Sequence, residues 1–283
     1  MRMSAAFTAA RILDTGSCRA SEHHLISGGS RRRVDVHSLV ALLQHPERGW
    51  LLWDTGYAPR VFDATRRWPY RIYRWVTPMR VSAKQTVVAQ LPHLGLEPGN
   101  IHTVVLSHLH PDHVSGLMDF QEAEWVVTAS AWRAVAQRKG ARALLKAFVP
   151  GLLPPDFGSR ARLLDDDAFT GPVLDPFGPT HDLFGDGSAL LVPLPGHAHG
   201  QLGLLATTVH GRMFLVGDAC WTSQSYRERR TPGSVTRIIT DDWNLVADTI
   251  DRLHRFWLAN PDVAIVPAHC PEAYRRHVGQ GSA

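Results

Sequence analysis

A cluster of metal-binding side chains directly after a short apolar run constrains this chain most. Ile101–Leu106 is apolar and β-prone, and it continues into the sequence His-Leu-His-Pro-Asp-His at residues 108–113. Residues two apart lie on different faces of a helix, whereas a loop leaving a strand can turn its side chains toward one point. Pro111 also disfavours a continuous helix. The pattern predicts a loop at a strand end that holds a metal through His108, His110, Asp112 and His113.

The composition indicates which atoms would bind such a metal. The 283 residues include 16 histidines but only three cysteines, at positions 18, 220 and 270. These cysteines are few and far apart, so they predict no disulfide framework. Imidazole and carboxylate are ligands that zinc, iron, manganese and cobalt accept. We therefore expect histidine and aspartate, rather than thiolate, to hold any metal.

The overall composition is that of a soluble globular enzyme, with 44% apolar and 20% charged residues. The apolar runs are too short to cross a bilayer, and Ala5–Ala10 is too weak for a signal segment, so the cytoplasm is the expected compartment. The net charge is +4. Because only Lys84, Lys139 and Lys146 are lysines, this charge reflects a preference for arginine, and nucleic-acid binding is not favoured.

Strand-like and helix-like patterns alternate along the chain. Val36–Leu43 and Trp50–Trp53 read as a β-hairpin. Further strands are expected at Ile101–Leu106, Trp125–Thr128, Ala189–Pro193, Gln201–Thr208, Met213–Val216 and Val263–Val266. Helices are expected at Ser82–Leu94, Ser130–Arg138, Ala141–Phe148 and Asp242–Leu258. The last of these has a continuous apolar stripe and a candidate N-cap at Thr240 or Asp241. Pro150–Pro179 reads as a long irregular connection.

These patterns favour one α/β fold, in which two mixed sheets pack face to face with helices outside. We expect a single domain over residues 1–283, with an insert at about residues 57–81. The stretch Arg60–Val81 mixes six arginines with five aromatic rings. It could cover the core with its rings and face water with its arginines. It could also form a substrate lid or a dimer contact, and less readily a nucleic-acid surface.

The motif at residues 108–113 resembles the metal-binding signature of the metallo-β-lactamase superfamily. Further blocks follow in the order of that family: Pro195-Gly196-His197, Gly217-Asp218 and Ala268-His269, each after an expected strand. The resemblance spans roughly residues 35–270. It implies an αββα sandwich with the site at one edge and two divalent metal ions. Zinc is the expected metal, with iron, cobalt and manganese as alternatives.

The resemblance also implies a role for each site residue. The first metal would be held by His108, His110 and His197, and the second by Asp112, His113 and His269, with Asp218 between them. A hydroxide shared by the metals would attack a lactone or ester carbonyl, and Asp112 would carry a proton to the leaving group. Asp54 resembles an acid that hydrogen-bonds a ligand imidazole, although it could equally be a turn residue.

Within the superfamily, the chain looks most similar to stand-alone hydrolases that include acyl-homoserine lactonases. Asp218 replaces the cysteine of the commonest β-lactamases, and His110 replaces a glutamate typical of flavodiiron proteins. Lactonases of this group carry a tyrosine three residues after the bridging aspartate. Here that position is Trp221, and Tyr226 is a candidate substitute.

The expected function is therefore hydrolysis of a small-molecule lactone or ester, including acyl-homoserine lactones, by a dinuclear enzyme. A phosphoester or organophosphate hydrolase on the same metal pair is an alternative. A mononuclear iron sulfur dioxygenase is a further alternative, and a non-catalytic binding module is a last one. The aromatic insert makes a homodimer a further expectation. The sequence does not specify the native substrate, because loops determine specificity.

Overall fold

A computed structural model describes residues 6–278, and two mixed β-sheets form its centre. The first sheet has seven strands in the order β4-β1-β2-β3-β5-β6-β7. Strands β3, β5, β6 and β7 are parallel, and β1 and β2 are antiparallel to their neighbours. The bounds are Ala9–Ser21 (β1), Arg33–His45 (β2), Gly49–Trp53 (β3), Met79–Arg80 (β4), Ile101–Val105 (β5), Glu124–Thr128 (β6) and Arg162–Leu164 (β7).

The second sheet has five strands in the order β10-β11-β12-β13-β14. Only the β13–β14 pair is parallel among them. Their bounds are His181–Asp182 (β10), Ala189–Pro193 (β11), Leu202–Thr208 (β12), Gly211–Gly217 (β13) and Ala264–Pro267 (β14). A separate ribbon pairs β8 (Val173–Leu174) with β9 (Gly178–Pro179).

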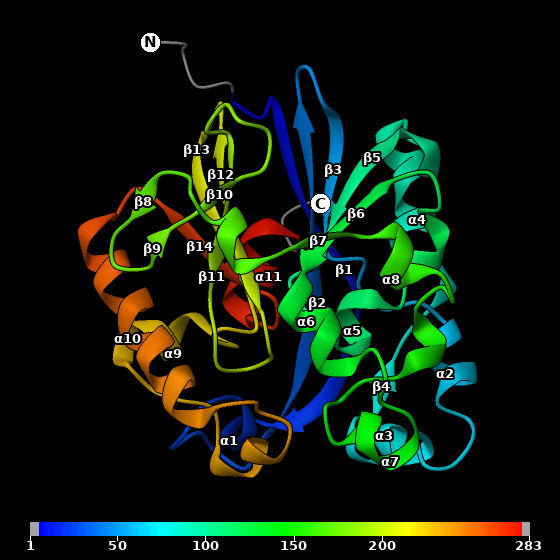
Figure 1. The fold of residues 1–283 in the computed structure, drawn as a ribbon. Coiled ribbons are helices and arrows are strands. Elements are labelled where there is room, and N and C mark those ends of the chain that lie inside the picture. The colour runs from blue at the N-terminus through cyan, green and yellow to red at the C-terminus, as the bar shows by residue number, and fades with distance from the viewer. Residues whose placement is uncertain (1–5, 279–283) are drawn as a thin grey trace.

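Helices cover the two outer faces (Figure 1), with α9 and α10 on one side and α4 and α8 on the other. The α-helices are Glu22–Leu25 (α1), Arg60–Ala64 (α2), Arg71–Val76 (α3), Val87–Gln90 (α4), Pro111–Val114 (α5), Ala129–Val135 (α6), Gly140–Leu144 (α7), Phe157–Arg160 (α8), Ser223–Glu228 (α9), Trp243–Ala259 (α10) and Pro271–His277 (α11). Short 3-10 turns lie at Ala83–Gln85, Leu91–Leu94, Pro98–Asn100, Leu117–Asp119, Pro150–Leu152, Asp166–Ala168 and Ser234–Ile238. In the part described here, no helix is long and apolar enough to cross a membrane.

The alternation of side chains along each strand produces the layers. In β2, Val40 and Leu42 face the helices of one side, whereas Leu39, Ala41 and Leu43 face the other sheet. Successive strand residues point to opposite faces, so a strand buried on both sides is apolar throughout. The second sheet follows the same rule and also packs against α9 and α10. The expected αββα sandwich is confirmed.

The strongest helical pattern in the sequence predicts its helix to within one residue at each end. The expected helix Asp242–Leu258 is α10, and its buried side chains include Val246, Ile250, Leu253 and Phe256. The N-cap prediction is wrong, because Asp242 caps the helix through the backbone amides of Asn244 and Leu245. Asp241 is engaged elsewhere, in an ion pair with Lys146.

Other local predictions need correction. Ser82–Leu94 is not one helix but α4 flanked by two 3-10 turns, with Pro92 in the second turn. The connection at Pro150–Pro179 contains β7, which extends the first sheet. The long strand β1 was not expected, because its sequence shows no clear apolar alternation. Pairing with β2 along its length stabilises it instead.

Replacing Phe256 by alanine tests the packing of α10. Phe256 is 1% exposed, and its ring lies 5.3 Å from Phe214 and 5.7 Å from Phe177 between centroids. Loss of a buried aromatic ring leaves a cavity, so Phe256→Ala should lower the free energy of unfolding by about 3–5 kcal/mol in urea titration. Leu258→Ala is the control, because Leu258 is on the same helix and 61% exposed. Equal effects would contradict this packing.

Candidate metal centre

The ends of four strands from both sheets carry the candidate ligands. The motif at residues 108–113 follows β5, His197 follows β11, Asp218 follows β13 and His269 follows β14. Backbone hydrogen bonds hold this region together: Leu202 N, at the start of β12, donates to Ser107 O at 2.9 Å, and Ala268 N donates to Gly217 O at 3.1 Å. The packing of the sheets therefore brings together residues that lie far apart in the sequence.

The motif itself is only partly a loop, which corrects the sequence-based expectation. His108 and His110 precede the short helix α5, which begins at Pro111 and contains Asp112 and His113. Proline fits the first turn of a helix, where its missing N–H needs no partner. Pro111 thus starts a helix here rather than preventing one. His108 and His110 thereby join one group of candidate ligands, and Asp112 and His113 join a neighbouring one.

The loop that carries His197 depends on a glycine. Gly196 has a φ of +128°, and a Cβ atom at this position would lie 2.4 Å from Val246 N in α10. The loop is held there because Asp241 N donates to His197 O at 3.0 Å and Asp242 N donates to Gly196 O at 2.9 Å. Only a residue without a side chain allows this close approach.

The predicted ligands lie in two triads, and a third group, made of His108, His113 and Asp218, joins them. Candidate ligand atoms of His108, His110 and His197 lie within 4.8 Å of one another, and so do those of Asp112, His113 and His269. Asp218 Oδ1 lies 3.2 Å from His113 Nε2. Asp218 Oδ2 lies 3.3 Å from His197 Nε2 and 3.1 Å from His269 Nε2. Asp218 therefore contacts members of both triads.

Several buried polar atoms in this cluster have no hydrogen-bond partner. Within residues 6–278, His108 Nε2 is one such atom, and His113 Nε2 and Asp218 Oδ1, although 3.2 Å apart, make no hydrogen bond. A buried polar group without a partner is costly, and in native proteins it calls for an explanation such as an ion. His197 Nε2 and His110 Nδ1 also face each other at 3.0 Å. The donor set and its unsatisfied atoms fit a metal centre.

The electrostatics of the cluster divide the imidazoles into two groups. Burial lowers the pKa of His108 well below its usual range, that of His110 to about 4 and that of His197 to about 3. Neutral imidazole is the form that binds metal. Burial also opposes charge on His269, but Asp218 and Asp112 raise its pKa to about 9. The carboxylates of Asp218 and Asp112, 3.1 and 3.4 Å from His269 Nε2, therefore favour charge on that imidazole.

Asp54 contacts one of the candidate ligands, His113. It is fully buried, and its carboxylate lies 2.8 Å from His113 Nδ1. It also accepts hydrogen bonds of 2.7 Å from Ser107 N and Ser107 Oγ. Its φ is 56°, an uncommon value for a residue other than glycine. Such strain at a buried carboxylate is typical of a functional position. The contact with the imidazole of His113 is the one that the resemblance implies, and the positive φ agrees with the alternative of a turn residue.

Trp221 and Tyr226 occupy different environments. Trp221 Nε1 donates to Asp218 Oδ2 at 3.0 Å, so its only N–H on the ring is directed at a candidate ligand. Tyr226 is 2% exposed and packs against Trp257 in the core beneath α10. The structure therefore places Trp221 at the site and Tyr226 in the hydrophobic interior.

A cavity of about 170 Å³ opens beside the candidate ligands, and we call it the site cavity. Its lining includes Asp112, Asp218 and Trp221 together with Cys18, Tyr57 and Tyr73. The last three were missed by the sequence reasoning, although the insert that contains Tyr73 was a candidate lid. Burial raises the pKa of Cys18 to about 12, so its thiol stays protonated and is a poor nucleophile.

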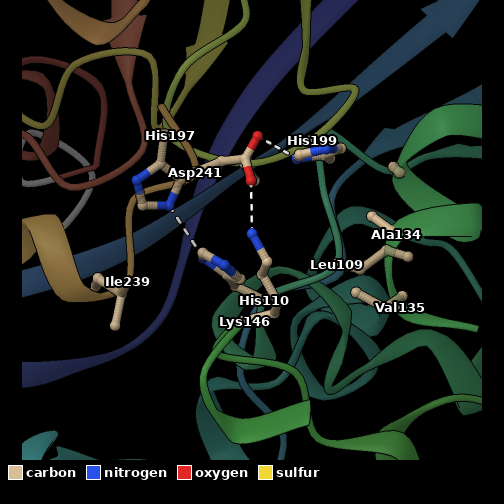
Figure 2. A pocket seen from close by; sticks show the side chains of 11 residues that line it. Leu109, His110, Ala134, Val135, Lys146, His197, His199, Ile239 and Asp241 are labelled. Carbon is tan, nitrogen blue, oxygen red and sulfur yellow. Dashed lines mark hydrogen bonds and ion pairs between the residues drawn. The ribbon is translucent and has the colours of Figure 1, made fainter. Parts of the chain in front are cut away.

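Asp241 forms ion pairs beside the loop that follows His197. Figure 2 shows Asp241 between Lys146 and His199. The Lys146 Nζ atom lies 2.6 Å from Asp241 Oδ1, and His199 Nδ1 pairs with Asp241 Oδ2. Three separate segments of the chain meet at this carboxylate. His199, whose side chain is half exposed, thus pairs with Asp241 and belongs to neither triad.

Asp54→Asn tests the support of His113. Asparagine tolerates the left-handed backbone at this position but lacks the charge that holds the imidazole. Loss of such an outer contact typically weakens metal affinity by about 10- to 100-fold. The measurement is competition for zinc with a coloured chelator. Asp248→Asn is the control, since Asp248 pairs with Arg252 on the surface of α10. Unchanged affinity in Asp54→Asn would contradict the assigned role.

Comparisons with known proteins agree with this architecture. A curated relative named N-acyl homoserine lactonase AttM, from Azorhizobium caulinodans, is 27% identical over 93% of both chains. A probable metallo-hydrolase from Mycobacterium tuberculosis is also 27% identical, over 89% of this chain and 81% of the relative. A solved N-acyl homoserine lactone hydrolase with bound N-hexanoyl-L-homoserine has a TM-score of 0.74 at 17% identity, over 96% of both chains.

A dizinc quorum-quenching lactonase, AidC, has a TM-score of 0.64 at 14% identity and covers 95% of this chain and 92% of its own. At such low identities the solved structures establish the fold. The family described as the metallo-beta-lactamase superfamily matches residues 33–269. The chain is therefore a metal-dependent hydrolase that belongs to the metallo-beta-lactamase superfamily.

Proposed function

We propose that this protein hydrolyses lactones or esters, with acyl-homoserine lactones as the first substrate class to test. The observation that carries the proposal is the pair of candidate triads beside the site cavity, with Asp218 in contact with members of both. The curated relatives named as lactonases support the same chemistry. We also propose that residues 1–283 form one domain and that the protein acts in the cytoplasm.

The proposed ligands are His108, His110 and His197 for one metal and Asp112, His113 and His269 for the other, with Asp218 shared. When bound, such a metal pair supplies an activated water and polarises the carbonyl group. Zinc is the proposed metal, since imidazole and carboxylate are among its preferred ligands. Seven ligands are more than one ion needs, which favours this reading over a mononuclear dioxygenase.

The side chains of the cavity have separate tasks in this proposal. Asp112 lines the cavity and its side chain is 16% exposed, so it can reach a substrate as well as a ligand position. It would carry a proton to the departing oxygen. Trp221 would orient Asp218 through its ring N–H. The apolar lining, which includes Val36, Val76 and Ile239, suits an acyl group.

The insert supports a proposed homodimer. Trp68, Trp75 and Val76 are 72%, 64% and 72% exposed, which is unusual for large apolar side chains. Covering them with a second copy would remove apolar surface from water. Light scattering that gave the mass of one chain would contradict this proposal.

A substrate panel tests the proposed function. The zinc-loaded protein should hydrolyse acyl-homoserine lactones or simple lactones faster than a phosphotriester. Asp218→Ala should lower the rate by more than about a hundredfold, because it removes a contact shared by both triads and even outer contacts are worth 10- to 100-fold. Asp248→Ala is the surface control. Preferential phosphotriester hydrolysis would favour the phosphoesterase alternative, and full activity of Asp218→Ala would exclude the shared-ligand mechanism.

A further inference from the structure

The hydroxyl of Ser107 lies between the carboxylate of Asp54 and the imidazole of His108. Ser107 directly precedes the ligand motif, and its side chain is fully buried. Its Oγ atom lies 2.7 Å from Asp54 Oδ2 and 3.0 Å from His108 Nδ1. Gly217 packs against the same side chain, since a Cβ atom on that glycine would lie 3.2 Å from Ser107 Oγ. The hydroxyl is therefore enclosed by protein, and its hydrogen bonds are made within the site.

The number of available protons determines the direction of each of these hydrogen bonds. An ionised carboxylate only accepts, so the single O–H of Ser107 is donated to Asp54. The hydrogen bond between Ser107 Oγ and His108 Nδ1 is then donated by the imidazole. A neutral imidazole has one N–H, and the neutral form is the one that binds metal. The proton of His108 is therefore on Nδ1, which leaves the lone pair on Nε2.

His108 Nε2 is the atom that this arrangement makes available to a metal. It is buried, and among residues 6–278 it has no hydrogen-bond partner. His108 belongs to the first triad, with His110 and His197. A hydrogen bond to the other ring nitrogen of a metal-binding histidine fixes both the position of the proton and the orientation of the ring. Ser107 makes this hydrogen bond to His108.

Asp54 makes the corresponding contact with the second triad directly. Its Oδ2 atom lies 2.8 Å from His113 Nδ1, whereas Asp218 Oδ1 lies 3.2 Å from His113 Nε2. Ser107 Oγ is also 3.3 Å from His113 Nδ1, but the carboxylate is nearer and is the stronger acceptor. The same oxygen of Asp54 therefore accepts from a ligand of the second triad and from the serine that contacts a ligand of the first.

We propose that Ser107 is a positioning residue for the first metal site and links that site to Asp54, which positions the second. The inference rests on the proposed function, because it uses the metal ligands named there. Ser107 accepts the Nδ1 proton of His108 and so keeps the lone pair of Nε2 available to the first triad. Loss of this hydroxyl then weakens one metal site, whereas loss of the Asp54 charge weakens both.

The test is Ser107→Ala, measured by competition for zinc with a coloured chelator that resolves two binding steps. Loss of an outer partner of a metal-binding histidine typically lowers metal affinity by about 10- to 100-fold. Because a hydroxyl is an uncharged acceptor, we expect the low end of this range, a loss of about 10-fold for one zinc ion. The affinity for the other ion should not change. Asp54→Asn should weaken the binding of both ions.

Ser115→Ala is the matched control. Ser115 is equally buried and lies at the end of α5 in the same segment, but its hydroxyl donates to the backbone oxygen of Pro111. Either substitution removes a buried hydrogen bond, so both should lower the thermal midpoint of the metal-free protein. Only Ser107→Ala should lower the affinity for zinc. This difference separates a positioning role from a merely structural one.

Two further variants identify which metal site is affected. His110→Ala removes a ligand of the first triad only, and His269→Ala removes a ligand of the second triad only. In the His269→Ala background, adding Ser107→Ala should weaken the remaining ion by about 10-fold. In the His110→Ala background, adding Ser107→Ala should leave the affinity for the remaining ion unchanged. The opposite pattern would overturn the assignment of Ser107 to the first site.

The outcomes separate this inference from the proposed function. Selective weakening of one ion in Ser107→Ala supports the inference even in a protein that hydrolyses neither lactones nor esters, a result that would overturn only the proposed function. Zinc affinities of Ser107→Ala equal to those of Ser115→Ala would overturn the role of Ser107 and leave the proposed function standing. Equal weakening of both ions in Ser107→Ala would also overturn that role, since His113 keeps its contact with Asp54.

Discussion

The carboxylate of Asp218 is the point at which the two halves of the structure meet. It contacts imidazoles that follow β5, β11 and β14, at distances of 3.1 to 3.3 Å. Burial alone would raise its pKa, but His269, His113 and His197 lower it well below the usual value. A carboxylate buried with three imidazoles is stable only if its charge is balanced. The packing of the two sheets provides that balance by bringing the strand ends together.

The need to bring these strand ends together accounts for the unusual backbone conformations near the site. Asp54 takes a left-handed backbone conformation to reach His113, and Gly196 brings the His197 loop against α10. Both conformations cost free energy locally, and the packing around them keeps them in place. The ion pairs of Asp241 with Lys146 and His199 lie at the same loop. The site thus depends on residues that would bind no metal themselves.

Much of the candidate site could be predicted because the motif at residues 108–113 and the later blocks follow expected strands in the order of the family that they resemble. The layers, the hairpin of β2 and β3, and α10 follow from apolar periodicity. The strand β1 could not be predicted, since it is stabilised by pairing with β2 rather than by its own pattern. Tyr57 and Tyr73 were also missed. Their place at the cavity depends on the conformation of the insert, which only the folded chain specifies.

Trp221 occupies the position at which the resemblance to lactonases predicts a tyrosine, and the structure shows what its side chain contacts. An indole N–H that binds Asp218 leaves the cavity without the hydroxyl that the resemblance to lactonases led us to expect at that position. The insert brings two other phenols to the same space. The absence of a tyrosine at position 221 thus coincides with the presence of phenols from the insert at the same cavity. This is consistent with the general rule that loops, rather than the scaffold, set specificity.

The metal content of the purified protein tests the central claim most directly. Elemental analysis after dialysis should give about two divalent ions per chain, as expected for two ligand triads joined by a carboxylate. Asp218→Ala should retain at most one. A wild-type protein that binds a single ion, or none, under metal-replete conditions would contradict the account.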